Sequence, residues 1–155
     1  MKCLIYELGA DVNVSADDGS LPLHIAACNP YIDAVIMLTD RRYAYERNKN
    51  MKDRNGCTPL HYASRNGSET MVRFLAIKLG VDVNVRDNYG ITPLHLASQQ
   101  GFKKVVNVLV CEARADIFLK NKKGQIPLDI AVENKHGDIV KILVKMSLAN
   151  INVLL

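Results

Sequence analysis

A six-residue motif recurs four times along this chain at nearly constant spacing. Its fullest form is Thr-Pro-Leu-His-Leu-Ala at residues 92–97, and related forms begin at Leu21, Thr58 and Ile126. A glycine stands three residues before each proline, and these glycines, at positions 19, 56, 90 and 124, lie 37, 34 and 34 residues apart. Self-similarity at a fixed period of this size predicts a solenoid, in which each repeat packs on its neighbours.

The order of residue types within each repeat predicts a turn followed by two helices. The glycine supplies the positive φ that such a turn needs. The proline is expected in the first turn of a helix, with Thr58 and Thr92 as N-caps in the second and third repeats. An apolar segment with helical spacing follows, and Gly9 and Gly80 mark the ends of such segments. The sequence therefore predicts an all-α fold of stacked helix-turn-helix units.

The repeat period divides the 155 residues into units of a single domain. We expect a partial repeat, four full repeats and the start of a further one, at residues 1–15, 16–52, 53–86, 87–120, 121–147 and 148–155. Because the ends of a solenoid normally have a polar outer face and neither end here looks like that, we expect a longer array.

The pattern Asp-x-x-Gly-x-Thr-Pro-Leu-His-x-Ala, a second glycine, an apolar helix and Gly-x-Asp-Val-Asn resembles the ankyrin repeat. Residues 87–97 with Gly101, and residues 53–63 with Gly67, carry it almost completely. The resemblance implies an ankyrin solenoid of L-shaped units, each with two antiparallel helices and a short β-hairpin loop projecting from the base. The departures from the pattern, which leave this architecture unchanged, are Leu21, Pro30, Ile126, Asp129 and Lys135.

A narrower likeness concerns the second repeat. Residues 53–63, followed by Gly-Val-Asp-Val-Asn at 80–84, look like units in the long ankyrin arrays of the latrotoxins, which are arthropod presynaptic toxins. This likeness implies an alternative function, as a segment of a secreted toxin that acts on presynaptic membranes. Units of this kind also occur in many unrelated ankyrin proteins.

Exposed positions that differ between repeats are where we expect function. Stacking should align the hairpin tips, the residue after each tip glycine and the ends of the first helices into one concave strip that binds a partner protein. The candidate residues, called the variable strip below, are Asp17, Asp18, Arg54, Asn55, Arg65, Asn66, Asn88, Tyr89, Ile91, Gln99, Gln100, Lys122 and Lys123. Further variable positions are Ser20, Cys28, Asn29, Cys57, Gln125, Glu133 and Asn134.

The charge of the variable strip changes along the array. Its tips are acidic in the first repeat and basic in the fourth, at Lys122 and Lys123. A partner of opposite polarity would therefore be steered into one orientation. Arg54, Arg65 and Tyr89 are the best anchor candidates, because arginine and tyrosine are enriched among residues that dominate binding energy.

His24, His61 and His95 occupy the same phase in three repeats, where a metal or catalytic role must be considered. The ankyrin resemblance implies instead that each histidine bonds locally and ties neighbouring units together. No cluster of cysteine and histidine has the spacing of a zinc site, and Asp129 replaces the imidazole in the fourth repeat. We therefore expect a structural role for these histidines.

No sequence motif supports catalysis. The chain has no Gly-rich phosphate loop followed by Lys and Ser or Thr, no G-x-S-x-G and no H-E-x-x-H. Cys28 and Cys57 are expected at surface positions, as inert thiols without a histidine partner. We expect no enzymatic activity, no cofactor, no metal and no small-molecule substrate.

Residues 41–52 combine several cations with Tyr43 and Tyr45. Phosphate or nucleic-acid contact through this basic loop is an alternative function. Asp40 and Glu46 offset part of its charge, so a solvated loop is our main interpretation. The net charge of +4 does not by itself indicate nucleic-acid or membrane binding, and we do not expect nucleic acid as a partner.

The four cysteines form no CxxC pair and are expected to be free thiols. Free thiols favour a reducing compartment, so we expect a cytoplasmic protein, or a secreted one under the toxin alternative. No stretch approaches the length of a membrane span.

Overall fold

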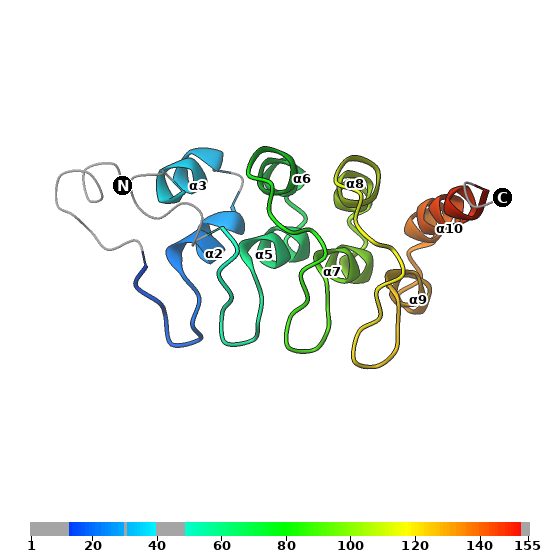
Figure 1. The fold of residues 1–155 in the computed structure, drawn as a ribbon, viewed down its shortest axis with the longest axis horizontal. Helices are drawn as coiled ribbons and strands as arrows, with labels where there is room; N and C mark the ends of the chain where they lie inside the picture. The colour runs from blue at the N-terminus through cyan, green and yellow to red at the C-terminus, as the bar shows by residue number, and fades with distance from the viewer. Residues whose placement is uncertain (1–12, 30, 40–48, 153–155) are drawn as a thin grey trace.

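The computed structural model describes residues 13–29, 31–39 and 49–152, with side chains as far as residue 149. Four pairs of helices stand side by side in chain order, with hairpin-shaped loops along one edge (Figure 1). The first helices of the pairs are α2 (Pro22–Ala27), α5 (Pro59–Arg65), α7 (Pro93–Gln100) and α9 (Pro127–Glu133). The second helices are α3 (Ile32–Leu38), α6 (Glu69–Arg73), α8 (Lys103–Asn107) and α10 (Gly137–Asn152). The predicted stack of helix-turn-helix units is confirmed.

Turns rather than paired strands close the hairpin loops of the described ranges. In the second repeat the N–H of Asp53 donates to the carbonyl of Cys57 at 2.9 Å, and the N–H of Gly56 donates back to Asp53 at 3.0 Å. Gly56 has a φ of +79°, which an L-residue with a Cβ adopts only with strain. The tip glycine is thus a backbone requirement of the loop, as its recurrence predicts.

Each first helix begins at its proline. The side chain three residues after the N-cap residue accepts the N–H of that N-cap residue. His61 Nδ1 accepts the N–H of Thr58 at 3.0 Å, and His95 Nδ1 accepts that of Thr92 at 3.1 Å. Thr92 Oγ1 also accepts the N–H of His95 at 3.4 Å, as predicted for an N-cap. Thr58 is the N-cap residue of α5, as predicted, and its Oγ1 lies 2.9 Å from His61 Nδ1.

The second helices of the middle repeats end at a left-handed residue after a π-helical turn. These turns are η2 (Phe74–Lys78) and η3 (Val108–Glu112), and the left-handed residues are Gly80 at φ +59° and Arg114 at φ +56°. The glycine stop predicted at Gly80 is therefore present, and Arg114 adopts the same conformation at the cost of strain that glycine avoids.

The last helix differs from the boundary expected after residue 147. α10 continues to Asn152, through most of residues 148–155, where the sequence suggested the start of a further repeat. The position equivalent to Gly80 and Arg114 is Leu148, which has no positive φ. Without a left-handed residue to end it, the helix continues.

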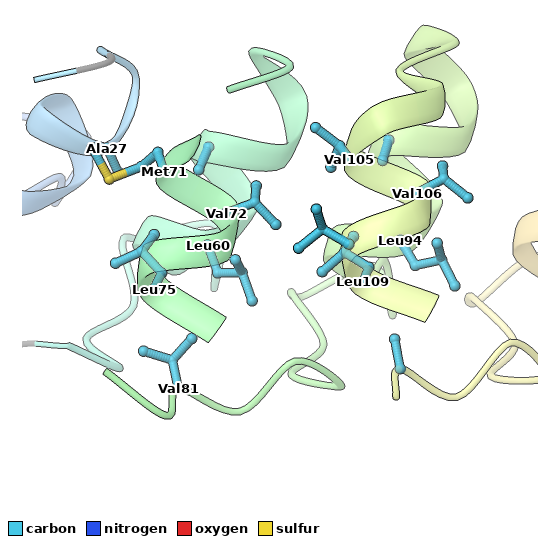
Figure 2. Packing of buried hydrophobic residues seen from close by; sticks show 14 of the residues in the cluster. Ala27, Leu60, Met71, Val72, Leu75, Val81, Leu94, Val105, Val106 and Leu109 are labelled. Atoms are coloured by element: carbon cyan, nitrogen blue, oxygen red, sulfur yellow. The ribbon is translucent and has the colours of Figure 1, made fainter. Parts of the chain in front are cut away.

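Leucines, valines and alanines at fixed repeat positions form one continuous core between neighbouring units (Figure 2). Figure 2 shows Leu60 close to Leu75 in one unit and Leu94 close to Leu109 in the next. Ala63 and Ala97 are fully buried between the first helices, where a larger side chain would separate the units. The core thus runs along the array and holds each repeat in register with the next.

Two buried hydroxyls within this core lack a hydrogen-bond partner among the described residues. Ser64 and Ser98 are both fully buried, and they occupy equivalent positions in α5 and α7. The first repeat has Ala27 at this position, also fully buried. Because an unpaired buried hydroxyl is costly, Ser64→Ala is expected to leave the free energy of unfolding unchanged or raise it by up to about 1 kcal/mol. Urea unfolding measures this, and a loss above about 1 kcal/mol would show that the hydroxyl has a partner.

Candidate functional site

The variable strip lies along the hairpin tips and the ends of the first helices, which are the helices nearer the hairpin loops (Figure 1). Ile91 is half-buried, because it follows the tip glycine and turns back toward α7. The remaining predicted residues are all exposed: Asp17, Asp18, Arg54, Asn55, Arg65, Asn66, Asn88, Tyr89, Gln99, Gln100, Lys122 and Lys123.

Backbone hydrogen bonds join each hairpin tip to the next. The N–H of Arg54 donates to the carbonyl of Asp18 at 3.1 Å, and the N–H of Asn88 donates to Asn55 at 2.9 Å. The N–H of Lys122 continues the series to the carbonyl of Tyr89 at 2.9 Å. The backbone therefore fixes the spacing of the tips, while their side chains differ from repeat to repeat.

A side-chain oxygen braces the tip in each of the last three repeats. In the third repeat Asp87 Oδ1 accepts the N–H groups of Tyr89 and Ile91, each at 2.8 Å. Asp53 and Asn121 bind two amides in the same way in their own loops. These bonds hold the exposed tip residues on a rigid turn. The tips therefore lose less conformational entropy when a partner binds.

The first hairpin tip is built differently, because Ala16 stands where the other loops have Asp or Asn. Asp18 takes over the bracing role and accepts the N–H of Ser20 at 2.8 Å. These hydrogen bonds to Ser20 lower the pKa of the exposed Asp18 carboxyl, so it carries its charge at neutral pH. Ser20 itself is buried, which corrects its expected place among the exposed variable positions.

Arg65 is held in place on the variable strip by two neighbours. Its guanidinium carbon lies 5.8 Å from the centre of the Tyr62 ring, within the range of a cation–π interaction. One of its terminal nitrogens donates to Cys57 Sγ at 3.7 Å. Tyr62 is fixed in turn, because its hydroxyl donates to Asp53 Oδ2 at 2.8 Å. The sequence did not single out Tyr62, where the other repeats have Ile or Leu.

The cysteine positions require a correction. Cys57 was expected at the surface, but only 2% of its surface is exposed, because it follows the tip glycine and packs against the next hairpin. Burial, followed by the nearby Asp53 carboxylate, raises the pKa of its thiol to about 11. Cys28 is half-buried, and desolvation raises its thiol pKa as well. Both thiols are therefore protonated at neutral pH, in agreement with the expected inert role.

A hollow of about 220 Å³ opens between the third and fourth repeats. Part of the variable strip lines it: Tyr89, Ile91, Gln99, Lys122 and Lys123. Further walls come from Gln125, Glu133 and Asn134, which the sequence placed among the variable positions. The structure thus brings together side chains from two hairpin tips and from the ends of α7 and α9.

The three histidines have the structural role implied by the resemblance. His61 Nε2 lies 3.0 Å from the carbonyl of Ile91 in the next loop, and His95 Nε2 lies 3.1 Å from that of Gln125. Because Nδ1 accepts a backbone N–H, Nε2 carries the proton and donates to these carbonyls. Desolvation lowers the pKa of His24, His61 and His95, to about 4 for His61, so all three rings are neutral at pH 7.

The described residues hold no group of His, Cys, Asp and Glu side chains suited to a metal ion. No described helix is long and apolar enough to cross a bilayer. Of the basic stretch 41–52, residues 41–48 lie outside the described ranges. Lys49 Nζ donates to the carbonyl of Leu79 at 3.3 Å and Lys52 Nζ to that of Arg86 at 3.0 Å, so both contact the following repeat.

The family comparison covers nearly the whole chain. A model described as ankyrin repeats (3 copies) matches residues 1–87 and again residues 77–154. No curated protein matches the chain, and the narrower likeness to latrotoxin arrays gains no support. Ankyrin repeats generally mediate protein–protein interaction and form a non-enzymatic interaction fold. On its repeat pattern, its stacked helix pairs and this match, the chain belongs to the ankyrin-repeat family.

Proposed function

We propose that this chain binds a partner protein along the variable strip. The observation that carries the proposal is the backbone bonding of successive tips through Arg54, Asn88 and Lys122. It aligns exposed side chains of four repeats on one rigid edge, and those side chains do not repeat. A surface that is regular in backbone and irregular in side chains suits recognition of one particular partner.

Two residues give this surface anchors of the kind that dominate binding energy. Arg65 is pre-organised over Tyr62, so little side-chain entropy remains to be lost when it contacts a partner. Tyr89 exposes 63% of its surface at the third tip and offers a large apolar face beside a hydroxyl. Arginine and tyrosine in such positions are typical of binding hot spots.

The charge gradient sets the orientation of the partner. Asp17 and Asp18 form an acidic end, while Lys122 and Lys123 form a basic end. These groups are exposed, so their field is screened over about 8 Å at physiological salt, and it steers an approaching partner more than it adds affinity.

Charge reversal at Arg54 and Arg65 combined with Tyr89→Ala is expected to weaken partner binding at least tenfold, or about 1.4 kcal/mol. A partner segment is obtained by selecting a random peptide display library against the whole chain. Its dissociation constant is then measured by fluorescence anisotropy for each variant.

Matched control variants come from the second helices and their starts. Lys78→Glu and Lys145→Glu reverse exposed charges there, and Tyr31→Ala removes an exposed tyrosine beside α3. These controls are expected to change affinity less than twofold. If the controls weaken binding as much as the strip variants do, the variable strip is not the binding surface.

No described contact favours the toxin or the nucleic-acid alternative. Cytoplasmic location also belongs to the proposal, and it is supported by the free thiols of Cys28, Cys57 and Cys111.

A further inference from the structure

We propose that the hollow between the third and fourth repeats binds an acidic segment of the partner, with a carboxylate between Lys122 and Lys123. The inference rests on the proposed function and specifies the chemistry of the partner at one end of the variable strip. It follows from the charge around the hollow, the hydrogen bonds already made by the nearby carboxylates of Asp87 and Glu133, and the residues that form the walls.

The cations around this hollow outnumber its free anions. Lys122 and Lys123 are exposed at the fourth tip and have no ion-pair partner among the described residues. Arg86 reaches the same edge, where its guanidinium donates to the carbonyl of Lys120 at 2.6 Å. A Cβ atom placed on Gly90 would lie 2.8 Å from a guanidinium nitrogen of Arg86, so this cation lies against the third tip. Three cations, Lys122, Lys123 and Arg86, therefore lie at one pair of hairpin loops.

The carboxylates nearby are already occupied. Asp87 Oδ1 binds the amides of its own turn, and its Oδ2 lies 3.9 Å from Cys57 Sγ. Glu133 Oε1 accepts the side-chain N–H of Gln125 at 2.6 Å. Neither carboxylate forms an ion pair with the lysines of the tip among the described residues. The ammonium groups of Lys122 and Lys123 therefore remain available to a carboxylate from outside.

The walls favour a peptide over a nucleic acid. Tyr89 and the half-buried Ile91 form an apolar side beside the lysines, and Gln99 supplies an amide that can bond a peptide backbone. Of the described side chains that line the hollow, Tyr89 is the exposed aromatic one and His95 is buried, whereas sequence-tolerant binding of single strands uses successive exposed aromatic rings for stacking.

The test uses the whole chain and a fluorescein-labelled polyglutamate peptide as the probe. A polylysine peptide and an oligothymidylate strand of similar length serve as comparisons. Polyglutamate is expected to bind and polylysine is not. Lys122→Glu with Lys123→Glu is expected to weaken polyglutamate binding at least about tenfold. Glu133→Gln removes a like charge from the wall and should tighten it about two- to threefold, while the amide oxygen still accepts from Gln125.

The matched control is Lys141→Glu with Lys145→Glu, an equal charge change on exposed positions of α10 in the same repeat. It should change polyglutamate affinity less than twofold. Circular dichroism melting of every variant shows that it is folded before affinities are compared.

Three outcomes overturn the inference: no binding of polyglutamate, equal weakening by the α10 control, or tighter binding of oligothymidylate with the same dependence on Lys122 and Lys123. The last outcome would assign the hollow to nucleic acid. If polyglutamate fails while the selected partner still depends on Arg54 and Arg65, only the acidic-segment inference is wrong. If the selected partner ignores Arg54 and Arg65 as well, the proposed function fails with it.

Discussion

Gly56→Ala is expected to lower the free energy of unfolding by about 3 kcal/mol, whereas Gly124→Ala should lower it by only about 1 kcal/mol. Both glycines close a hairpin tip, with φ of +79° and +80°. Alanine in this left-handed conformation costs about 1 kcal/mol at either site. The difference must therefore come from what surrounds each tip.

At Gly56 the new methyl group meets the next repeat. It would lie 2.8 Å from the backbone nitrogen of Asn88 and 2.6 Å from the Oδ1 atom of the same residue. The side chain could move, but the backbone nitrogen is bonded to Asn55 and cannot retreat without breaking the contact between the tips. Relieving such an overlap adds about 2 kcal/mol. At Gly124 no described atom lies within 4 Å of the new methyl.

Urea unfolding of the two variants and the parent chain, followed by circular dichroism, measures this difference. Equal losses at Gly56 and Gly124 would mean that only backbone strain matters and that the tips are not packed against each other. The variable strip would then lack the rigid spacing on which the binding proposal depends.

Acid should destabilise the fold through its buried histidines, with His61 alone contributing about 3 kcal/mol at pH 4. Above an ordinary histidine pKa of 6.5 the imidazole is neutral in both the folded and the unfolded chain. As the pH falls from 6.5 to about 4, the unfolded chain binds a proton that folded His61 does not, because burial lowers its pKa to about 4. The free energy of unfolding therefore falls over this window and is not reduced further by His61 below it.

His24 and His95 act in the same direction, because desolvation lowers their pKa values too. His61→Gln isolates one of the three. The variant should be less stable than the parent at neutral pH, because the bond to the Ile91 carbonyl is weakened. Its stability should also depend less on pH, since one proton-linked group is gone.

Urea unfolding at several values between about pH 7.5 and pH 4 gives the measurement. We expect the parent chain to lose about 3 kcal/mol more than His61→Gln over this range. Parallel pH curves for the two proteins would show that His61 is protonated in the folded state and that its role as a neutral tie is wrong.

The repeat period alone predicted the helix pairs, the tip glycines and the exposed strip, because each depends on a local requirement that recurs. Proline and its preceding residues set a helix start, and glycine sets the positive φ of the tip. In the second and third repeats, each 34-residue period therefore coincides with one pair of helices. Local rules were sufficient wherever a single residue type, such as glycine or proline, meets a specific backbone requirement.

Neighbouring repeats decided the features that local rules missed. Cys57 follows a tip glycine and looks exposed in its own repeat, but the hairpin of the next repeat covers it. The continuation of α10 through Leu148 is instead a local feature, because no residue with a positive φ ends the helix there.

In the candidate site, too, the sequence predicted features that depend on single residues and missed those that depend on contacts between residues. Sequence variation singled out Arg65, Tyr89 and both lysines of the fourth tip as candidates, but not Tyr62, whose ring holds Arg65 in place. It also did not reveal the hollow, because that space exists only between two stacked repeats. Arg86 was missed as well, although its counterparts Lys52 and Lys120 form a cationic series at the same repeat position.

The most direct test of binding along the variable strip is a map of backbone amide chemical shifts of the whole chain, with and without a peptide from the display selection. We expect the largest changes at the tip amides of Arg54, Asn88, Tyr89 and Lys122 and at the ends of α5 and α7. Changes confined to the second helices α3, α6, α8 and α10 would contradict it.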